Sequence, residues 1–122
     1  MAAVASVVSI VLFLAFLTTG LQKVLFNPVM SRVAGHLGLT KRLYQRLGIA
    51  EMVAAIAVMV GLKASGSSVL AIVNEVAAGA LVALTASAVV AHRRAGDSIA
   101  AIAPAAVLGL LAAIELIFRV LQ

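Results

Sequence analysis

The sequence predicts an all-α protein that spans a membrane four times as an up-down-up-down helix bundle. Of its 122 residues, 65% are hydrophobic and 11% are charged, whereas about a quarter of a soluble domain is charged. Four apolar runs are each about as long as a helix that crosses a bilayer, which needs roughly 20 residues. Two of the three connections are short enough to join antiparallel neighbours. We therefore expect one transmembrane domain over residues 1–122, with no soluble domain.

The first span is predicted over residues 3–25. No charged residue lies between Met1 and Gln22. A cleaved signal peptide has a positive amino-terminal region and a shorter apolar run. We therefore interpret this segment as a retained span, which ends before Asn27-Pro28 because proline disfavours helix in the residue before it.

The connection over residues 28–40 is the longest in the chain. Its apolar residues Val29, Met30, Val33 and Leu37 fall on one helical face. This pattern predicts a short helix in the headgroup region of the membrane, and an irregular polar loop is the alternative. Thr40 is expected to cap the next helix.

The other three spans are predicted over residues 43–62, 68–91 and 98–120. Ser67 or Ser68 is placed to cap the third span, and Asp97 is placed to cap the fourth. A short turn over residues 63–66 precedes the third span. Pro104 lies inside the fourth span, where it either kinks the helix or is tolerated near its start.

The basic residues predict the orientation of the bundle. Loops one and three and their flanks carry Lys23, Arg32, Lys41, Arg42, Arg46, Arg93 and Arg94, whereas the other side has Lys63 and Arg119. Cytoplasmic loops carry an excess of lysine and arginine. We therefore expect a bacterial-type plasma membrane protein with loops one and three in the cytoplasm and both termini outside.

Ionisable residues inside the spans are costly in lipid and usually find a partner or face a cavity. Glu51 in the second span can pair with Lys23 at the end of the first, as a structural staple or as a functional site. Glu115 and Arg119 are four residues apart, a spacing that places them on one helical face. This second pair is either an end-of-helix pair or part of a site.

Glu75 is the intramembrane acid with no cation nearby in the sequence. It is protonated, paired with Lys63, hydrogen-bonded to Asn74, or exposed to a polar cavity. We group Asn74 and Glu75 with Glu115 and Arg119 as a second candidate site.

Small residues recur every four positions along the last two spans. The third span has Ala71, Gly79, Ala83, Ser87 and Ala91, and the fourth has Ala101, Ala105, Gly109 and Ala113. Such ridges let helices approach closely in lipid. They serve packing within the bundle or the binding of another subunit.

Several chemistries have no sequence support. There is no cysteine, and no zinc-ligand spacing, phosphate-binding loop or dinucleotide fingerprint is present. His36 and His92 are interpreted as surface histidines in the connections. Basic residues are not interleaved with aromatic ones, which argues against nucleic-acid binding. No cofactor or catalytic residue is identifiable.

Several short motifs follow one another along most of the chain. They are Thr19-Gly20-Leu21-Gln22-Lys23, His36-Leu37-Gly38-Leu39, Gly48-Ile49-Ala50-Glu51, Gly61 and His92-Arg93-Arg94-Ala95-Gly96-Asp97. In their order and spacing, these motifs together resemble the DoxX-like family of membrane proteins. The resemblance implies a four-helix membrane protein in which Lys23, Gly48 and Glu51 form a shared polar site. Glu75 and Glu115 lie outside the matching pattern.

The resemblance also bears on function. Some relatives belong to thiosulfate:quinone oxidoreductases or redox-linked membrane complexes, and others act as chaperones or accessory subunits. A quinone is thus implied as a cofactor by resemblance alone, and the missing cysteines count against a thiol-based redox role. We expect no catalytic activity of the chain by itself; within an enzyme it would be a membrane subunit of a quinone-linked oxidoreductase.

Three functions follow from these observations. The first is an accessory subunit, set in the lipid bilayer, that binds another membrane protein or a second copy of itself. The second is a quinone- or lipid-binding component that uses Lys23 and Glu51, which predicts a cavity beside them that opens laterally to lipid. The third is a small proton-coupled transporter that uses Glu75 and Glu115.

Overall fold

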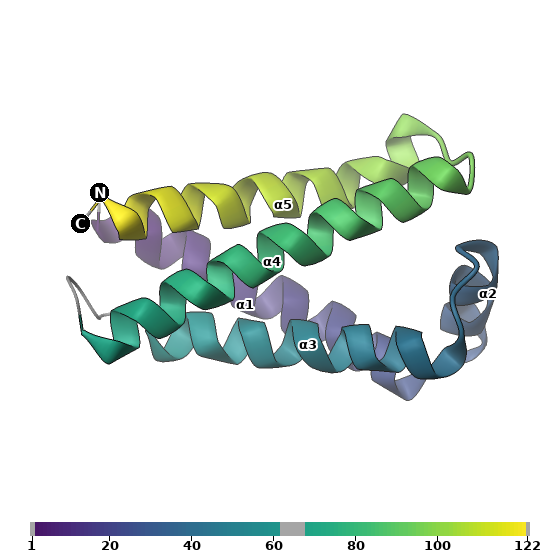
Figure 1. The fold of residues 1–122 in the computed structure, drawn as a ribbon, viewed down its shortest axis with the longest axis horizontal. Coiled ribbons are helices and arrows are strands. Elements are labelled where there is room, and N and C mark those ends of the chain that lie inside the picture. The colour runs from purple at the N-terminus through teal and green to yellow at the C-terminus, as the bar shows by residue number, and fades with distance from the viewer. Residues whose placement is uncertain (1, 62–67, 122) are drawn as a thin grey trace.

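The computed structural model describes residues 2–61 and 68–121 and shows an all-α fold there, as predicted (Figure 1). The helices are α1 (Ala2–Leu25), α2 (Pro28–His36), α3 (Lys41–Val60), α4 (Val69–Arg94) and α5 (Ile99–Val120). All but α2 are long and apolar enough to cross a membrane. The prediction of a polytopic four-span bundle is confirmed.

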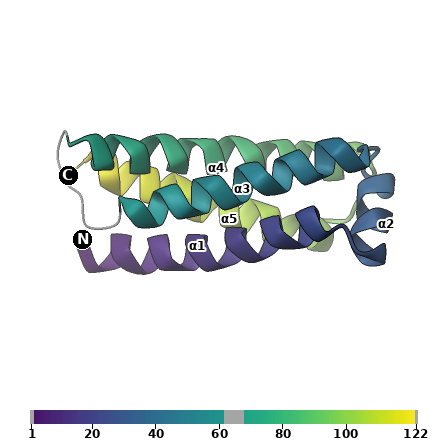
Figure 2. The ribbon, with the colours of Figure 1, turned by 90° about the horizontal axis from the view of Figure 1, so that it is seen from below.

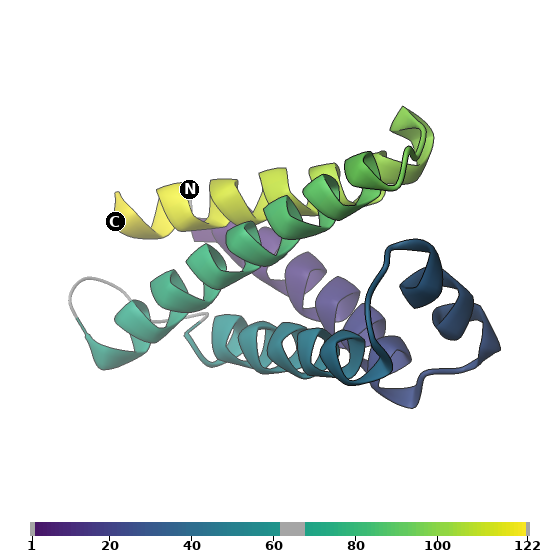
Figure 3. The same cartoon turned by 45° about the vertical axis from the view of Figure 1, so that its right-hand side comes forward.

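The four long helices alternate in direction and lie side by side (Figures 1 and 2). Both termini lie at one end of the bundle, here called the terminal end. Helix α2 and the α4–α5 connection lie at the other end, here called the α2 end. At the α2 end, α1 lies against α3 and α4 lies against α5, and these two pairs diverge (Figure 3).

The predicted short helix of the first loop is present as α2. Pro28 occupies its first turn, and the Asn27 side chain accepts a hydrogen bond from the Met30 amide at 2.9 Å. Proline suits this position because the amide it lacks has no partner inside a helix. The alternative of an irregular loop is wrong for residues 28–36.

Side-chain caps set the starts of the later helices. Thr40 accepts a hydrogen bond from the Leu43 amide, and Ser68 accepts one from Ala71, both at 3.2 Å. These caps were predicted, although Ser67 and the turn over residues 63–66 lie outside the described residues. The cap predicted at Asp97 is wrong, because Ser98 caps α5. The Asp97 carboxylate is held elsewhere by two histidines.

The bundle has a thin core and an aliphatic exterior. Leu12, Val58 and Leu81 are fully buried between the helices, with alanines filling much of the remaining interior. Many large aliphatic side chains point outward instead, which suits a helix bundle surrounded by lipid. Helix α5 continues through Pro104, and that residue is exposed.

The two ridges of small residues have different surroundings. A β-carbon at Gly109 would lie 2.6 Å from the Thr85 hydroxyl oxygen, so α5 packs closely on α4 there, and Ala105 nearby is partly buried. A β-carbon at Gly79 would have no neighbour within 4 Å, and Ala83 and Ser87 are exposed. Part of the α4 ridge therefore faces away from the bundle.

Candidate functional site

Helices α1 and α3 touch through their backbones at a pair of glycines. A β-carbon at Gly20 would lie 2.5 Å from the Gly48 carbonyl oxygen, and one at Gly48 would lie 2.6 Å from the Gly20 carbonyl oxygen. Lys23 and Glu51 each follow one of these glycines by three residues, on the same helical face. The close crossing thus brings the two charged side chains together.

Lys23 and Glu51 form the ion pair that the sequence suggested. The Lys23 ammonium donates to Oε1 of Glu51, and the Thr19 hydroxyl donates to Oε2 at 3.0 Å. Exposed fractions are 19% for the Lys23 side chain and 8% for Glu51. Both carboxylate oxygens are satisfied, while the lysine keeps part of its surface open.

One aromatic ring, that of Tyr44, lies beside the lysine of the pair. The Lys23 ammonium lies 5.4 Å from the centre of the Tyr44 ring, within the range of a cation–π contact. The Tyr44 ring meets Phe26 edge to face at 6.1 Å. The Tyr44 hydroxyl lies 3.6 Å from the Met30 sulfur, so it links the pair to α2.

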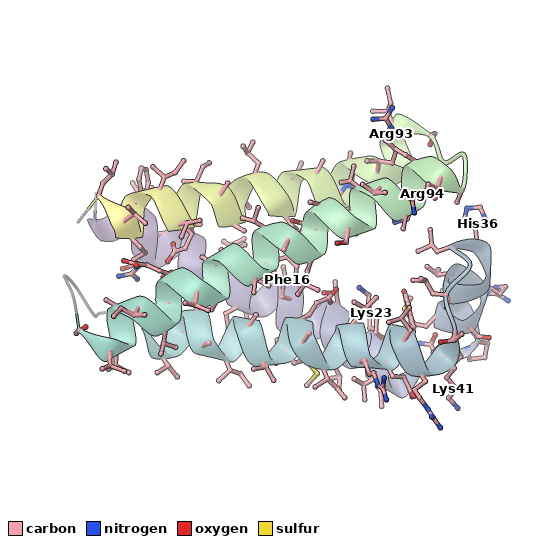
Figure 4. The ribbon with its side chains drawn as sticks, viewed as in Figure 1. Phe16, Lys23, His36, Lys41, Arg93 and Arg94 are labelled. Carbon is pink, nitrogen blue, oxygen red and sulfur yellow. The ribbon has the colours of Figure 1, made fainter. Side chains whose placement is uncertain are left out.

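A cavity of about 190 Å³ adjoins the ion pair between α2, α3 and α4. In Figure 4, Lys23 points into the space between the diverging helix pairs. Most of the lining is aliphatic, and the polar lining residues are Lys23, Tyr44, Glu51, Ser87 and His92. A cavity therefore lies beside Lys23 and Glu51, and its lateral opening to lipid stays a prediction.

Three residues join the walls of this cavity at the α2 end. Asp97 Oδ1 lies 2.5 Å from His36 Nε2, and Asp97 Oδ2 lies 2.5 Å from His92 Nδ1. We call this group the histidine clamp. The hydrogen bonds from His92 and then His36, which favour the charged carboxylate, lower the pKa of Asp97. The clamp ties α2 to the α4–α5 connection.

The clamp was not anticipated from the sequence. His36 and His92 were interpreted as separate surface histidines, and the His36 side chain is indeed 53% exposed. That interpretation is wrong for His92, whose side chain is 23% exposed and lines the cavity. His36 and Asp97 are 61 residues apart, and only the tertiary fold brings them together.

A second ion pair lies at the terminal end. Arg119 Nε donates to Oε1 of Glu115 at 3.0 Å, and the side chains are 3% and 0% exposed. The Ser9 hydroxyl donates to the same oxygen at 2.6 Å and ties the pair to α1. Within the described residues, Oε2 of Glu115 is buried without a hydrogen-bond partner. The pair is thus internal to the bundle, and Ser9 is a partner that the sequence did not suggest.

From the sequence, Asn74 and Glu75 are grouped with the Glu115–Arg119 ion pair as one candidate site, but no described contact joins the first two residues to this pair. Asn74 is fully buried, contacts Gly61 and donates to the Val58 carbonyl oxygen at 2.8 Å. Glu75 is partly buried, and no hydrogen bond or ion pair to its carboxylate occurs among the described residues. Lys63, its suggested partner, lies outside them.

Within the described residues, no group of three or more histidine and carboxylate side chains, the histidine clamp included, could hold a metal ion. The chemistry that the Lys23–Glu51 site offers is hydrogen bonding. A lysine ammonium, a carboxylate, a tyrosine hydroxyl and an imidazole converge on one small, mostly apolar space.

Comparison with known proteins agrees with this architecture. No curated protein and no solved structure matches the chain. The model of the DoxX-like family matches residues 7–114, which include both glycines of the α1–α3 crossing and the whole Lys23–Glu51 site. The chain belongs to the DoxX-like family, as a small integral membrane protein with four spans.

Proposed function

We propose that this protein binds the polar head of a lipid-soluble molecule, a quinone or a lipid, in the cavity beside Lys23 and Glu51. The observation that carries this proposal is the position of the cavity. It adjoins the one described ion pair that joins two transmembrane helices. A binding site is expected to be mostly apolar with a few convergent polar groups, and this cavity has that composition.

The size and charge of the cavity limit its ligand. An engineered apolar cavity of about 150 Å³ in another protein binds benzene, so the volume of about 190 Å³ admits one six-membered ring. Lys23 and Glu51 neutralise each other, which favours an uncharged head over an anion. Lys23, Tyr44 and His92 supply hydrogen-bond donors for the oxygen atoms of such a head.

The charge distribution supports an orientation within this proposal. Both loop one and the α4–α5 connection lie at the α2 end, where Figure 4 also shows Lys41, Arg93 and Arg94. By the positive-inside rule this end faces the cytoplasm of a bacterial-type plasma membrane. The ligand head then lies in the cytoplasmic half of the bilayer.

Binding of a short-chain benzoquinone to the purified protein in detergent tests the proposal, with calorimetry as the measurement. Glu51→Gln removes the charge that holds Lys23, and we expect at least a tenfold loss of affinity. Glu75→Gln is the matched control, because Glu75 is also intramembrane but does not line the cavity. Equal affinities for the two variants, or no saturable binding to the wild type, would reject a quinone ligand. A zwitterionic phospholipid in the same assay tests the lipid alternative.

We also propose, as a second function, that the protein is an accessory subunit. The support is the row of small residues on α4, part of which faces away from the bundle. Gly79 and Ala83, which do not line the cavity, have room on the outside of the bundle for a partner helix. Purification in mild detergent tests it: Gly79→Leu should release a stoichiometric partner or second copy, while the Gly35→Leu control on α2 should not. A wild-type protein that purifies as a single chain without partners would count against this role.

A further inference from the structure

A long apolar groove lies on the outside of the bundle between α3 and α4, away from the Lys23–Glu51 cavity. Its volume is about 570 Å³, and every lining residue except Arg46 is alanine, valine or isoleucine. Val53 and Val76 are 61% and 67% exposed and form its rims, whereas Ala54 and Ala77 are buried at its floor. Small side chains at the floor and larger ones at the rims create a channel that one slender molecule can fill.

Arg46 is the single charged residue of this groove and lies at its α2 end. The side chain is exposed, and among the described residues no carboxylate lies within 4 Å of it. The two acids described at this end, Glu51 and Asp97, are held by Lys23 and by the histidine clamp. An anionic partner from outside the chain would therefore complement Arg46.

The length of the groove matches one leaflet of a bilayer. Its lining runs along α3 from Arg46 to Ala57, a separation of eleven helical steps that spans about 16 Å at 1.5 Å per step. Half of a hydrocarbon core is about 15 Å thick. Arg46 follows the start of α3 at Lys41 by five residues, or about 8 Å. A long arginine side chain at this depth reaches the headgroup region.

We propose that the groove is a binding site for one phospholipid, with an acyl chain between α3 and α4 and the lipid phosphate on Arg46. Guanidinium groups bind phosphate oxygens through two parallel hydrogen bonds. A transmembrane helix from a partner is a poorer occupant, because an apolar helix would leave the Arg46 guanidinium in the interface without an anion. This site is independent of the ligand proposed for the Lys23–Glu51 cavity.

The role of the Arg46 charge in binding the lipid phosphate is tested by native mass spectrometry, with phosphatidylglycerol added to the detergent-purified chain. Wild type should retain one lipid, and Arg46→Gln should bind it about tenfold more weakly. Arg93→Gln is the matched control, because Arg93 is an exposed arginine at the same end and does not line the groove. Equal weakening in both variants, or none in Arg46→Gln, would overturn the assignment of Arg46.

The acyl chain is tested separately from the phosphate. Ala80→Phe places a ring in the groove and should reduce retention of the long-chain lipid, while Leu110→Phe on the exposed face of α5 should not. Glycerol 3-phosphate, which has the phosphate without the chains, should not displace the lipid. Full displacement of the lipid by glycerol 3-phosphate, or wild-type retention of the lipid by the Ala80→Phe protein, would mean that the lipid binds outside the groove. A second copy of the chain in place of lipid would also overturn the proposal.

Discussion

Two of the described ion pairs lie within the transmembrane helices and contain the same kinds of groups in different surroundings. Lys23 and Glu51 join two helices beside a cavity, and 19% of the lysine side chain is exposed. Glu115 and Arg119 lie one turn apart on one helix, are 0% and 3% exposed, and reach α1 through Ser9. A buried pair with no open surface stabilises its helix packing, whereas a pair with an open flank can also meet a ligand. The surroundings, rather than the presence of intramembrane charge, distinguish a candidate binding site from a structural contact.

This difference predicts that, of the substitutions considered, loss of the Glu115 carboxylate lowers the free energy of unfolding most. Glu115→Leu removes the described partner of the buried Arg119 guanidinium, and breaking such a pair costs about 3–5 kcal/mol. Unfolding of the reconstituted protein by SDS, followed by circular dichroism, measures the loss. The double variant Glu115→Leu with Arg119→Leu should recover much of it, because both charges are then gone. If the Glu115→Leu protein resists SDS as well as wild type does, the ion pair does not contribute to the stability of the fold.

A second prediction concerns the crossing that assembles the binding-site pair. A β-carbon at Gly48 would lie 2.6 Å from the Gly20 carbonyl oxygen and 2.7 Å from Cβ of Lys23. Gly48→Val should therefore push α1 from α3 and cost about 1–3 kcal/mol, as overpacking does. It should also weaken ligand binding by separating Lys23 from Glu51.

Gly79→Ala is the control for this variant, since a β-carbon there meets nothing within 4 Å. Alanine favours a helix interior over glycine by about 0.5–1 kcal/mol, so the control should be as stable as wild type or slightly more so. The same SDS titration compares the two. A Gly48→Val protein with wild-type stability would contradict the close crossing.

The sequence predicts the parts of this fold that depend on local pattern. Apolar run length locates the spans, the amphipathic face of residues 28–40 locates α2, and a four-residue spacing suggests the pairing of Glu115 with Arg119. Lys23 and Glu51 are linked because both lie toward the same side of the membrane in consecutive antiparallel helices. Each of these inferences needs only helix geometry and the order of the elements.

The remaining contacts depend on how helices rotate and pack, which spacing does not encode. Ser9 reaches Glu115 across 106 residues, and α1 has no pattern that sets its serine apart from neighbouring small residues. Asp97 precedes α5 as a capping residue would, yet Ser98 takes that role and Asp97 turns to the histidines. The cavity likewise lies where the two helix pairs diverge, and the groove depends on which small residues of α3 and α4 come together at its floor. No motif marks either of them.

The smallest predicted effect belongs to the histidine clamp, which lies at the surface beside the cavity. The pKa of Asp97 is lowered in the folded protein, first by its hydrogen bond from His92 and then by that from His36. The unfolded state therefore binds a proton on this carboxyl at a higher pH than the folded state does. The stability contributed by the clamp is fully present above the ordinary aspartate pKa of about 3.9 and is lost as pH falls through the lowered folded value.

Asp97→Asn removes this titration and so should flatten the pH dependence of stability in the acidic range, with little change at pH 7 in the helix content. Spin labels on Arg32→Cys and Arg93→Cys report the opening of the clamp, because the natural chain has no cysteine and both positions are exposed. The distance distribution between the labels should broaden in the Asp97→Asn background, since α2 loses its tie to the α4–α5 connection. An unchanged distribution would mean that the contact of α2 with α3 alone holds it in place, and the clamp would then have no part in closing the cavity.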